Sequence, residues 1–303
     1  MRAIGYWLLV MVLVACSSEQ RQELPAEGNA VYYWRTDFRL DSTERAFLDT
    51  YDVKRIYCRY FDVVNDKRQG PVPNATLTFS EPFPEGVEII PTVFIMEDCM
   101  HHPSDSLARQ IVGRIIQMNE TNDVHNVHEI QIDCDYTARS RDTYYRFLEQ
   151  VREEFKNQNS QLRIQKSKFR NQNSILSTTI RLHQLSMPAP PVDYGVLMLY
   201  NTGDPQKLEQ RNPILDLRDV MPYIHYLKDY PLPMGAAYPV FTWQRTIHGI
   251  HIEHTAALQD IMTVKERVEN ERDDLRQLIL TYHLSTDNIN RYKTDDYEKI
   301  YRH

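Results

Sequence analysis

The chain has 303 residues, of which 42% are hydrophobic and 25% are charged, and its formal net charge is -7. This composition is typical of a globular protein with a sizeable core, which excludes a disordered chain, a disulfide-held miniprotein and a multi-span membrane protein. The acidic balance argues against a nucleic-acid partner. With 9 glycines against 19 tyrosines, the composition disfavours a glycine-rich nucleotide loop and favours carbohydrate as the ligand.

The amino terminus has the pattern of a bacterial export signal. A short basic start precedes an apolar run over 7–14, which is too short to remain as a membrane span. The run ends in the letters LVAC, which resemble a lipobox, the motif whose cysteine is acylated, here Cys16. We expect a signal peptide over 1–15, a lipidated tether over 16–29 and one domain over 30–303, held at the bacterial outer membrane by acyl chains such as palmitate. An ordinary cleaved signal with a chance cysteine is the alternative.

Three further cysteines follow Cys16, namely Cys58, Cys99 and Cys134. Their number is odd and no CxxC pair exists, which excludes a zinc ribbon. We expect all three to be small buried side chains and at least one to be a free thiol.

Strand patterns alternate with helix patterns along the body of the chain. Eight segments are predicted as strands: 30–34, 55–61, 87–96, 127–135, 175–182, 194–200, 235–243 and 277–283. Six are predicted as helices: 41–51, 104–118, 139–156, 215–227, 264–275 and 294–301. This alternation predicts an α/β protein, a (β/α)8 TIM-like barrel. A proline-rich insertion over 62–86, with a hairpin around 76–79, is expected after the second strand.

The fourth predicted strand alternates between apolar and polar side chains. One face carries Ile130, Ile132 and Cys134, and the other carries Glu129, Gln131, Asp133 and Asp135. In a barrel the apolar face packs on the helices, so the polar face points inward and places Asp133 and Asp135 at the carboxyl end, where barrel enzymes have their active sites. Two neighbouring carboxyls are typical of general acid chemistry. Capping of the next helix, or pairing with an arginine such as Arg139, is the alternative.

Other strand ends are expected to converge on the same mouth. The same alternation points Arg181 inward from the fifth strand, where it should favour the ionised form of Asp133 and leave Asp135 with the higher pKa. Trp34 and Trp243 end the first and seventh predicted strands and are candidate sugar platforms, with burial in the core as the alternative.

The segment 97–102 is a candidate metal site, because it holds two carboxylates, a cysteine and two histidines. His125 and His128 are further candidate ligands. None of these spacings is that of a recognised ligand pair. We therefore expect a solvated polar loop, no metal and no cofactor.

The fourth-strand series resembles the signature D-x-x-D-x-D-x-E of glycoside hydrolase family 18, the chitinase-like barrels. The segment 198–201, which reads MLYN, resembles their sixth-strand M-x-Y-D. The resemblance implies that Asp135 is the proton donor, that Asp133 assists it and that Tyr200 contacts the reacting sugar. Gln131 stands where the family has an acid, and Asn201 where it has an aspartate; both are candidate substrate-binding residues.

Two functions follow as expectations. One is a glycoside hydrolase that acts on a glycan by acid catalysis, with Arg181 and Trp243 helping Tyr200 to hold the sugar. The other is a catalytically inactive barrel that binds glycan or an envelope partner, favoured because Asp135 is one methylene shorter than Glu and because Asn201 replaces an acid. The segments QIDCDY, LSTTIRLHQL and LMLYNTGD also resemble barrel lipoproteins of Bacteroidota-type bacteria, a likeness that covers most of the chain and implies the fold.

Overall fold

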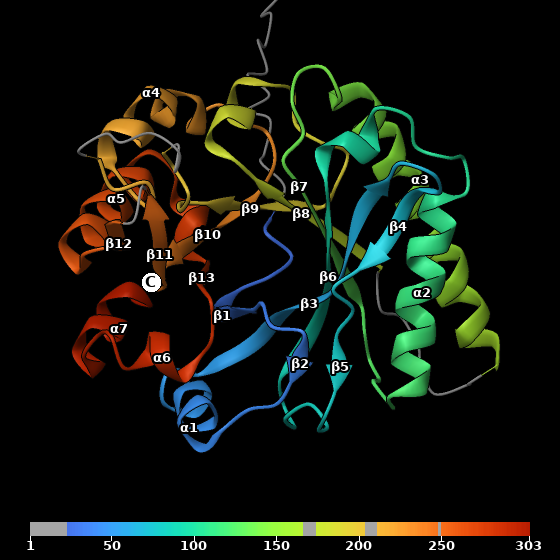
Figure 1. Cartoon of the computed structure of the whole chain (residues 1–303), viewed down its shortest axis with the longest axis horizontal. Helices are drawn as coiled ribbons and strands as arrows, with labels where there is room; N and C mark the ends of the chain where they lie inside the picture. Colours follow the sequence, from blue (N-terminus) through green and yellow to red (C-terminus); the bar gives the residue numbers. More distant parts are fainter. Residues whose placement is uncertain (1–22, 166–173, 204–210, 248–249) are drawn as a thin grey trace, which may run out of the picture.

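The computed structural model describes residues 23–165, 174–203, 211–247 and 250–303, and its centre is a sheet that closes on itself (Figure 1). The barrel strands run in the order β1-β13-β10-β9-β8-β7-β6-β3, and β3 pairs again with β1. They are β1 (Gly28–Tyr33), β3 (Val53–Asp66), β6 (Glu88–Ile95), β7 (Glu129–Cys134), β8 (Ile175–Ile180), β9 (Tyr194–Met198), β10 (Met234–Pro239) and β13 (Leu278–Tyr282). All these pairings are parallel. The predicted TIM-like barrel is confirmed, and each of the eight predicted strands overlaps a barrel strand.

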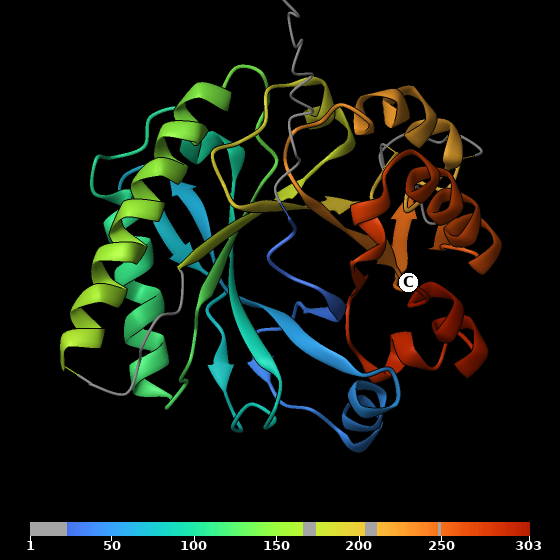
Figure 2. The same ribbon diagram turned by 180° about the vertical axis from the view of Figure 1, so that it is seen from behind.

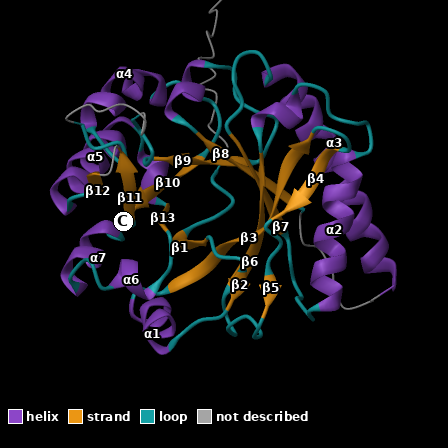
Figure 3. Ribbon diagram, in the orientation of Figure 1, coloured by secondary structure: helices purple, strands orange, loops and turns teal. Residues whose placement is uncertain are grey.

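Helices surround the barrel (Figure 3). They are α1 (Ser42–Thr50), α2 (Leu107–Thr121), α3 (Arg141–Gln165), α4 (Leu217–Leu227), α5 (Leu258–Glu271), α6 (Thr286–Ile289) and α7 (Thr294–Ile300). Short 3-10 turns lie at η1 (Glu97–Met100), η2 (Leu182–Ser186) and η3 (Asp273–Arg276). Helices α2 and α3 lie side by side on one flank in both views (Figures 1 and 2). Helix α1 begins where Asp41 and Glu44 form a capping box, because each side chain accepts a hydrogen bond from the other's backbone N–H.

The segment after β3 differs from the predicted insertion. Strand β3 continues to Asp66 and turns back as the antiparallel β4 (Gly70–Asn74), so that between β3 and β6, where every residue is described, the chain forms no helix. The hairpin predicted around 76–79 is wrong, because β5 (Thr78–Phe79) pairs in parallel with β2 (Asp37–Phe38) instead. That partner lies about forty residues away, beyond what a local turn pattern can indicate.

The seventh predicted strand is divided in two. Strand β10 ends at Pro239, and the N–H of Val240 donates the last hydrogen bond to the carbonyl of Tyr282. The chain then leaves the barrel as the antiparallel hairpin of β11 (Thr242–Ile247) and β12 (Ile250–Thr255). Trp243 therefore lies on β11, where it pairs with His254, and not at the end of a barrel strand as predicted.

Side chains along the barrel strands point alternately towards the helices and towards the barrel interior, as predicted. Ile130, Ile132 and Cys134 of β7 are fully buried in the core. The outward orientation of Thr178 is shown by its hydroxyl, which hydrogen-bonds that of Tyr144 on α3 at 2.7 Å. The three cysteines of the domain are buried and free, as predicted; they are Cys58, Cys99 and Cys134.

The export signal and Cys16 lie outside the described residues, so the domain boundaries proposed for them stay predictions. Within the described ranges, no helix is long and apolar enough to cross a membrane.

Candidate functional site

Polar side chains fill the barrel interior in successive layers along the barrel axis. The deepest layer contains an ion pair between Arg55 and Glu129. Glu129 of β7 is fully buried and accepts hydrogen bonds from Arg55, Ser177 and Tyr194, each at 2.5 Å. Above it, Gln131 is also fully buried and its Oε1 accepts from the hydroxyl of Tyr32 at 3.0 Å. These two layers form a polar floor, so Gln131 lies beneath the mouth and not on its surface.

The upper layer brings together the two predicted carboxylates and the predicted arginine. Asp133 is the penultimate residue of β7, its side chain is 3% exposed, and its Oδ1 accepts from the Thr179 hydroxyl at 2.6 Å. Arg181, just after β8, places its Nη2 at 3.6 Å from the same oxygen, while its Nε donates directly to Asp135. Asp135 lies beyond the end of β7 and is 51% exposed. The prediction that these residues converge is correct, but Arg181 lies closer to Asp135 than to Asp133.

The electrostatic prediction for Asp133 is wrong in direction. Burial raises the pKa of Asp133, and the neighbouring charge of Asp135 raises it further, whereas Arg181 and the Thr179 hydroxyl act to lower it. The sequence placed Asp133 next to Arg181 and therefore predicted that its ionised form would be favoured. Desolvation outweighs this attraction, because the carboxyl is enclosed at the end of the strand with a single guanidinium at 3.6 Å.

An aromatic wall stands beside this cluster. Tyr200 is 3% exposed and stacks on Tyr282 of β13, with ring centroids 4.5 Å apart and planes at 24°. The buried Tyr200 hydroxyl has no hydrogen-bond partner among the described residues. Asn201 follows at the rim, where it is exposed and has a left-handed backbone with φ of 53°.

A cavity of about 300 Å³ opens over these groups. Its lining comprises Asp135, Arg181, Leu182, His183, Met198, Tyr200, Asn201, Thr202 and Tyr223. Among these described residues Asp135 is the only carboxylate. The volume is at the lower end of small-molecule sites, and the mixture of tyrosines with hydrogen-bonding groups suits a polar ring such as a sugar.

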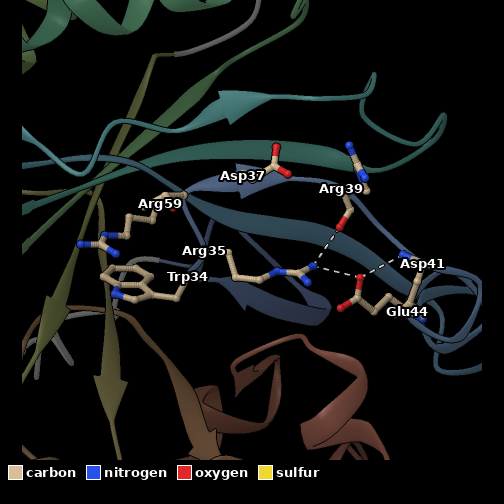
Figure 4. Close-up of a pocket in the computed structure, with 8 residues that line it drawn as sticks. Trp34, Arg35, Asp37, Arg39, Asp41, Glu44 and Arg59 are labelled. Atoms are coloured by element: carbon tan, nitrogen blue, oxygen red, sulfur yellow. Dashed lines mark hydrogen bonds and ion pairs between the residues drawn. The ribbon is translucent and has the colours of Figure 1, made fainter.

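Trp34 lies in the wall of a second cavity, of about 600 Å³ (Figure 4). The Arg59 guanidinium covers one face of its ring, 5.7 Å from the centroid, and the ring of Tyr282 lies at 5.6 Å. Elsewhere in this cavity Arg35 donates to Glu44 at 2.9 Å and to a backbone carbonyl. A sugar could stack on the covered face of Trp34 only after Arg59 moved, so this tryptophan is a weaker platform than the sequence suggested.

The histidines and acids of the segment 97–102 do not form a metal-binding arrangement in the structure. His101 pairs with Glu97 at 3.1 Å, and the other oxygen of Glu97 accepts from the hydroxyls of Thr137 and Ser140. No group of three or more histidine, cysteine or acidic side chains among the described residues could hold a metal ion.

Sequence reasoning did not identify two of the groups that shape the mouth. Tyr282 ends β13 and contacts both Trp34 and Tyr200, which nothing in the local sequence around it indicates. Arg59 is held by Asp62, which lies three residues later beside an irregularity in the pairing of β3 with β6. The irregularity changes which side chains point inward, and no periodic pattern reveals it.

Comparison with known proteins adds information on the fold. No protein-family model matches the chain, and no curated protein matches it. A family 18 N-acetylglucosaminidase from Paenibacillus barengoltzii is 9% identical, with a TM-score of 0.52 over 91% of this chain and 99% of its own. A chitinase from Bacteroides thetaiotaomicron is 10% identical, with a TM-score of 0.56 over 91% and 94%. Human YKL-39, described as a pseudo-chitinase with retained chitooligosaccharide binding, is 8% identical, with a TM-score of 0.54 over 91% and 98%.

These identities establish likeness of fold and not of activity. The chain has the closed, eight-stranded barrel fold of the chitinase-like proteins of glycoside hydrolase family 18.

Proposed function

We propose that this protein is a carbohydrate-binding barrel that holds a glycan at its carboxyl-end mouth without hydrolysing it. The observation that carries the proposal is the direct ion pair between Asp135 and Arg181. Asp135 stands at the position where the family 18 resemblance places the proton donor. A general acid must deliver a proton to the leaving oxygen, whereas the Asp135 carboxyl is engaged by the Nε–H of Arg181.

The side chain of Asp135 adds a second reason. It is one methylene shorter than the glutamate of the family signature, and the carboxyl is drawn towards Arg181 at the edge of the barrel. Binding does not need this proton. The aromatic wall of Tyr200 and Tyr282, and the hydrogen-bonding groups of the 300 Å³ cavity, are sufficient to hold a sugar ring.

The comparisons support both binding and catalysis as outcomes of this fold. One neighbour is described as a chitinase and another as a pseudo-chitinase that still binds chitooligosaccharides. A glycoside hydrolase is therefore the second candidate. It is favoured by the buried Asp133, whose raised pKa favours the protonated form of a carboxyl beside the mouth.

Binding and turnover distinguish the two functions. Wild type, Asp135→Asn and the distant surface control Asp49→Asn would be tested on the same panel of chitooligosaccharides and bacterial and host envelope glycans. We expect binding by all three proteins and release of sugar by none. Turnover by wild type and the control, but not by Asp135→Asn, would establish the hydrolase. Failure of every glycan to bind wild type would refute both.

We further propose that the barrel is a lipoprotein, tethered through acylated Cys16 at the outer membrane of a bacterial envelope. The support is the lipobox and the polar segment that separates it from β1. Stable anchoring requires more than one acyl chain. Cys16→Ala should move the protein from the membrane to the soluble fraction and abolish incorporation of labelled palmitate, whereas Cys58→Ala, at a buried position, should do neither. A Cys16→Ala protein that stays in the membrane fraction contradicts the anchor.

A further inference from the structure

Arg181 lines the 300 Å³ cavity, and its two acidic neighbours differ in how firmly they are held. The Arg181 side chain is 17% exposed. Asp133 is 3% exposed and is fixed by the Thr179 hydroxyl at 2.6 Å. Asp135 is 51% exposed, and Arg181 is its one hydrogen-bond partner among the described residues. The position of Asp133 is therefore fixed, whereas the Asp135 side chain can turn into solvent at a small cost in free energy.

Some N–H groups of the Arg181 guanidinium have no strong hydrogen-bond acceptor among the described residues. Its Nη2 lies 3.6 Å from Asp133, which is too long for a hydrogen bond. Its Nη1 faces the sulfur of Met198, a weak acceptor. Asp135 occupies only Nε. A carboxylate that entered from the cavity could take the Nε and Nη2 edge together, in the paired geometry that guanidinium and carboxylate prefer.

A second, independent feature points to a ligand in the same cavity. Tyr200 lines it with a side chain that is 3% exposed, and the buried Tyr200 hydroxyl has no hydrogen-bond partner in the described part of the chain. A buried hydroxyl without a partner is costly to maintain. An oxygen of a bound molecule would satisfy it.

We propose that Arg181 is a recognition residue for an acidic sugar, whose carboxylate takes the place of Asp135 while the sugar ring lies against Tyr200. This inference rests on the proposed glycan-binding function and names the class of glycan, one that contains uronic acid or another carboxylate-bearing sugar. Exchange of one carboxylate for another leaves the charge around Arg181 unchanged. A neutral sugar that displaced Asp135 would instead leave a largely buried guanidinium without the carboxylate that accepts its Nε–H, and with only Asp133 at 3.6 Å.

The proposal makes an unusual prediction for Asp135. Removal of its carboxyl removes the competitor for Arg181, so Asp135→Asn should bind an acidic oligosaccharide more tightly than wild type. We expect about a tenfold decrease in Kd, because one charge-assisted hydrogen bond no longer has to be broken. A catalytic or neutral-sugar site would lose affinity, or keep it unchanged, on the same substitution.

The test compares an oligosaccharide of uronic acid with the same oligosaccharide after reduction of its carboxyl groups, by calorimetry at two salt concentrations. Asp135→Asn should tighten the acidic ligand alone, and Arg181→Met should weaken it about tenfold or more. Arg152→Met is the matched control, since it removes a partly buried arginine of an Arg–Asp pair distant in the fold. It should change neither affinity. The carboxyl-reduced oligosaccharide bearing sulfate groups separates carboxylate recognition from attraction to any anion.

Three outcomes would overturn the inference. The first is equal affinity of wild type for the acidic and reduced ligands, with Asp135→Asn changing neither, which leaves the proposed glycan binding intact. The second is tighter binding of the sulfated than of the carboxylated ligand. The third is failure of wild type to bind either ligand or any glycan of the panel, which removes the proposed function as well. If Arg181→Met does not fold, the Asp135→Asn comparison decides alone, since that side chain is half exposed.

Discussion

The ion pair at the floor of the barrel makes a testable prediction about stability and pH. Glu129 is fully buried, and burial raises its pKa from 4.5 to about 7, although Arg55 and the hydroxyls of Ser177 and Tyr194 act to lower it. The folded protein therefore binds a proton at this site more tightly than the unfolded chain does. Its contribution to stability is complete below pH 4.5 and is lost as the pH rises through about 7. The difference between the two pKa values corresponds to about 3 kcal/mol.

Glu129→Gln removes this titration and keeps a carbonyl oxygen to accept from the two hydroxyls. Free energies of unfolding would be measured in urea at pH 5, 6, 7 and 8, with the slope m checked at each pH. Subtraction of the variant from wild type cancels the titration of other groups. Between pH 8 and pH 5, wild type should gain about 2 to 3 kcal/mol relative to Glu129→Gln.

The control uses the other acid that contacts Arg55. Glu88 pairs with the same guanidinium at 2.7 Å, but its side chain is 30% exposed. Glu88→Gln should change the unfolding free energy by about 1 kcal/mol or less. The reasoning fails if the difference between wild type and Glu129→Gln is the same at every pH. It fails more decisively if wild type loses stability relative to the variant on acidification, because Arg55 would then hold Glu129 ionised.

Three further predictions concern the scaffold. Gly235→Ala should lower the unfolding free energy by about 1 to 3 kcal/mol, since a Cβ there would lie 2.8 Å from the carbonyl oxygen of Leu278; an unchanged melting temperature would contradict this. Arg272→Met should cost about 3 to 5 kcal/mol in chemical unfolding, because this fully buried arginine donates to three backbone carbonyls within 227–232; a loss below about 1 kcal/mol would show that water replaces it. Burial raises the pKa of the Cys58 thiol, so iodoacetamide should not label it in the native protein at pH 8, as peptide mass spectrometry would show; labelling as fast as in urea would disprove its burial.

The side chains that face the interior of the barrel could be predicted because polar and apolar residues alternate within each strand. The alternation in β7 and β8 places Asp133, Thr179 and Arg181 on the inward side, and the structure has them there. A period of two residues determines which face a side chain occupies. It does not determine the height at which a residue of one strand meets a residue of the next, which is why the pairing of Arg55 with Glu129 could not be predicted.

The incorrect predictions concern features that the alternation along a strand does not determine. Trp243 was assigned to the mouth because residues 235–243 read as one apolar run, but the run contains the end of β10 and the start of β11. The pKa of Asp133 was misjudged because its charge partner was visible in the sequence and the extent of its burial was not. Both depend on packing between distant segments, which a local pattern does not encode.

Strand β4 gives the closed barrel one open border, where another polypeptide could in principle add a strand. An unpaired strand edge is a risk for self-association, because its N–H and C=O groups can pair with a neighbouring chain. Pro71 and Pro73 lie two residues apart in β4, so both would direct the N–H that they lack towards the same side. Since the other side pairs with β3, the prolines remove donors from the outer border. If the protein is tethered to a membrane through Cys16, as proposed, its copies meet often there, and Pro71 and Pro73 should keep the barrels from pairing through β4.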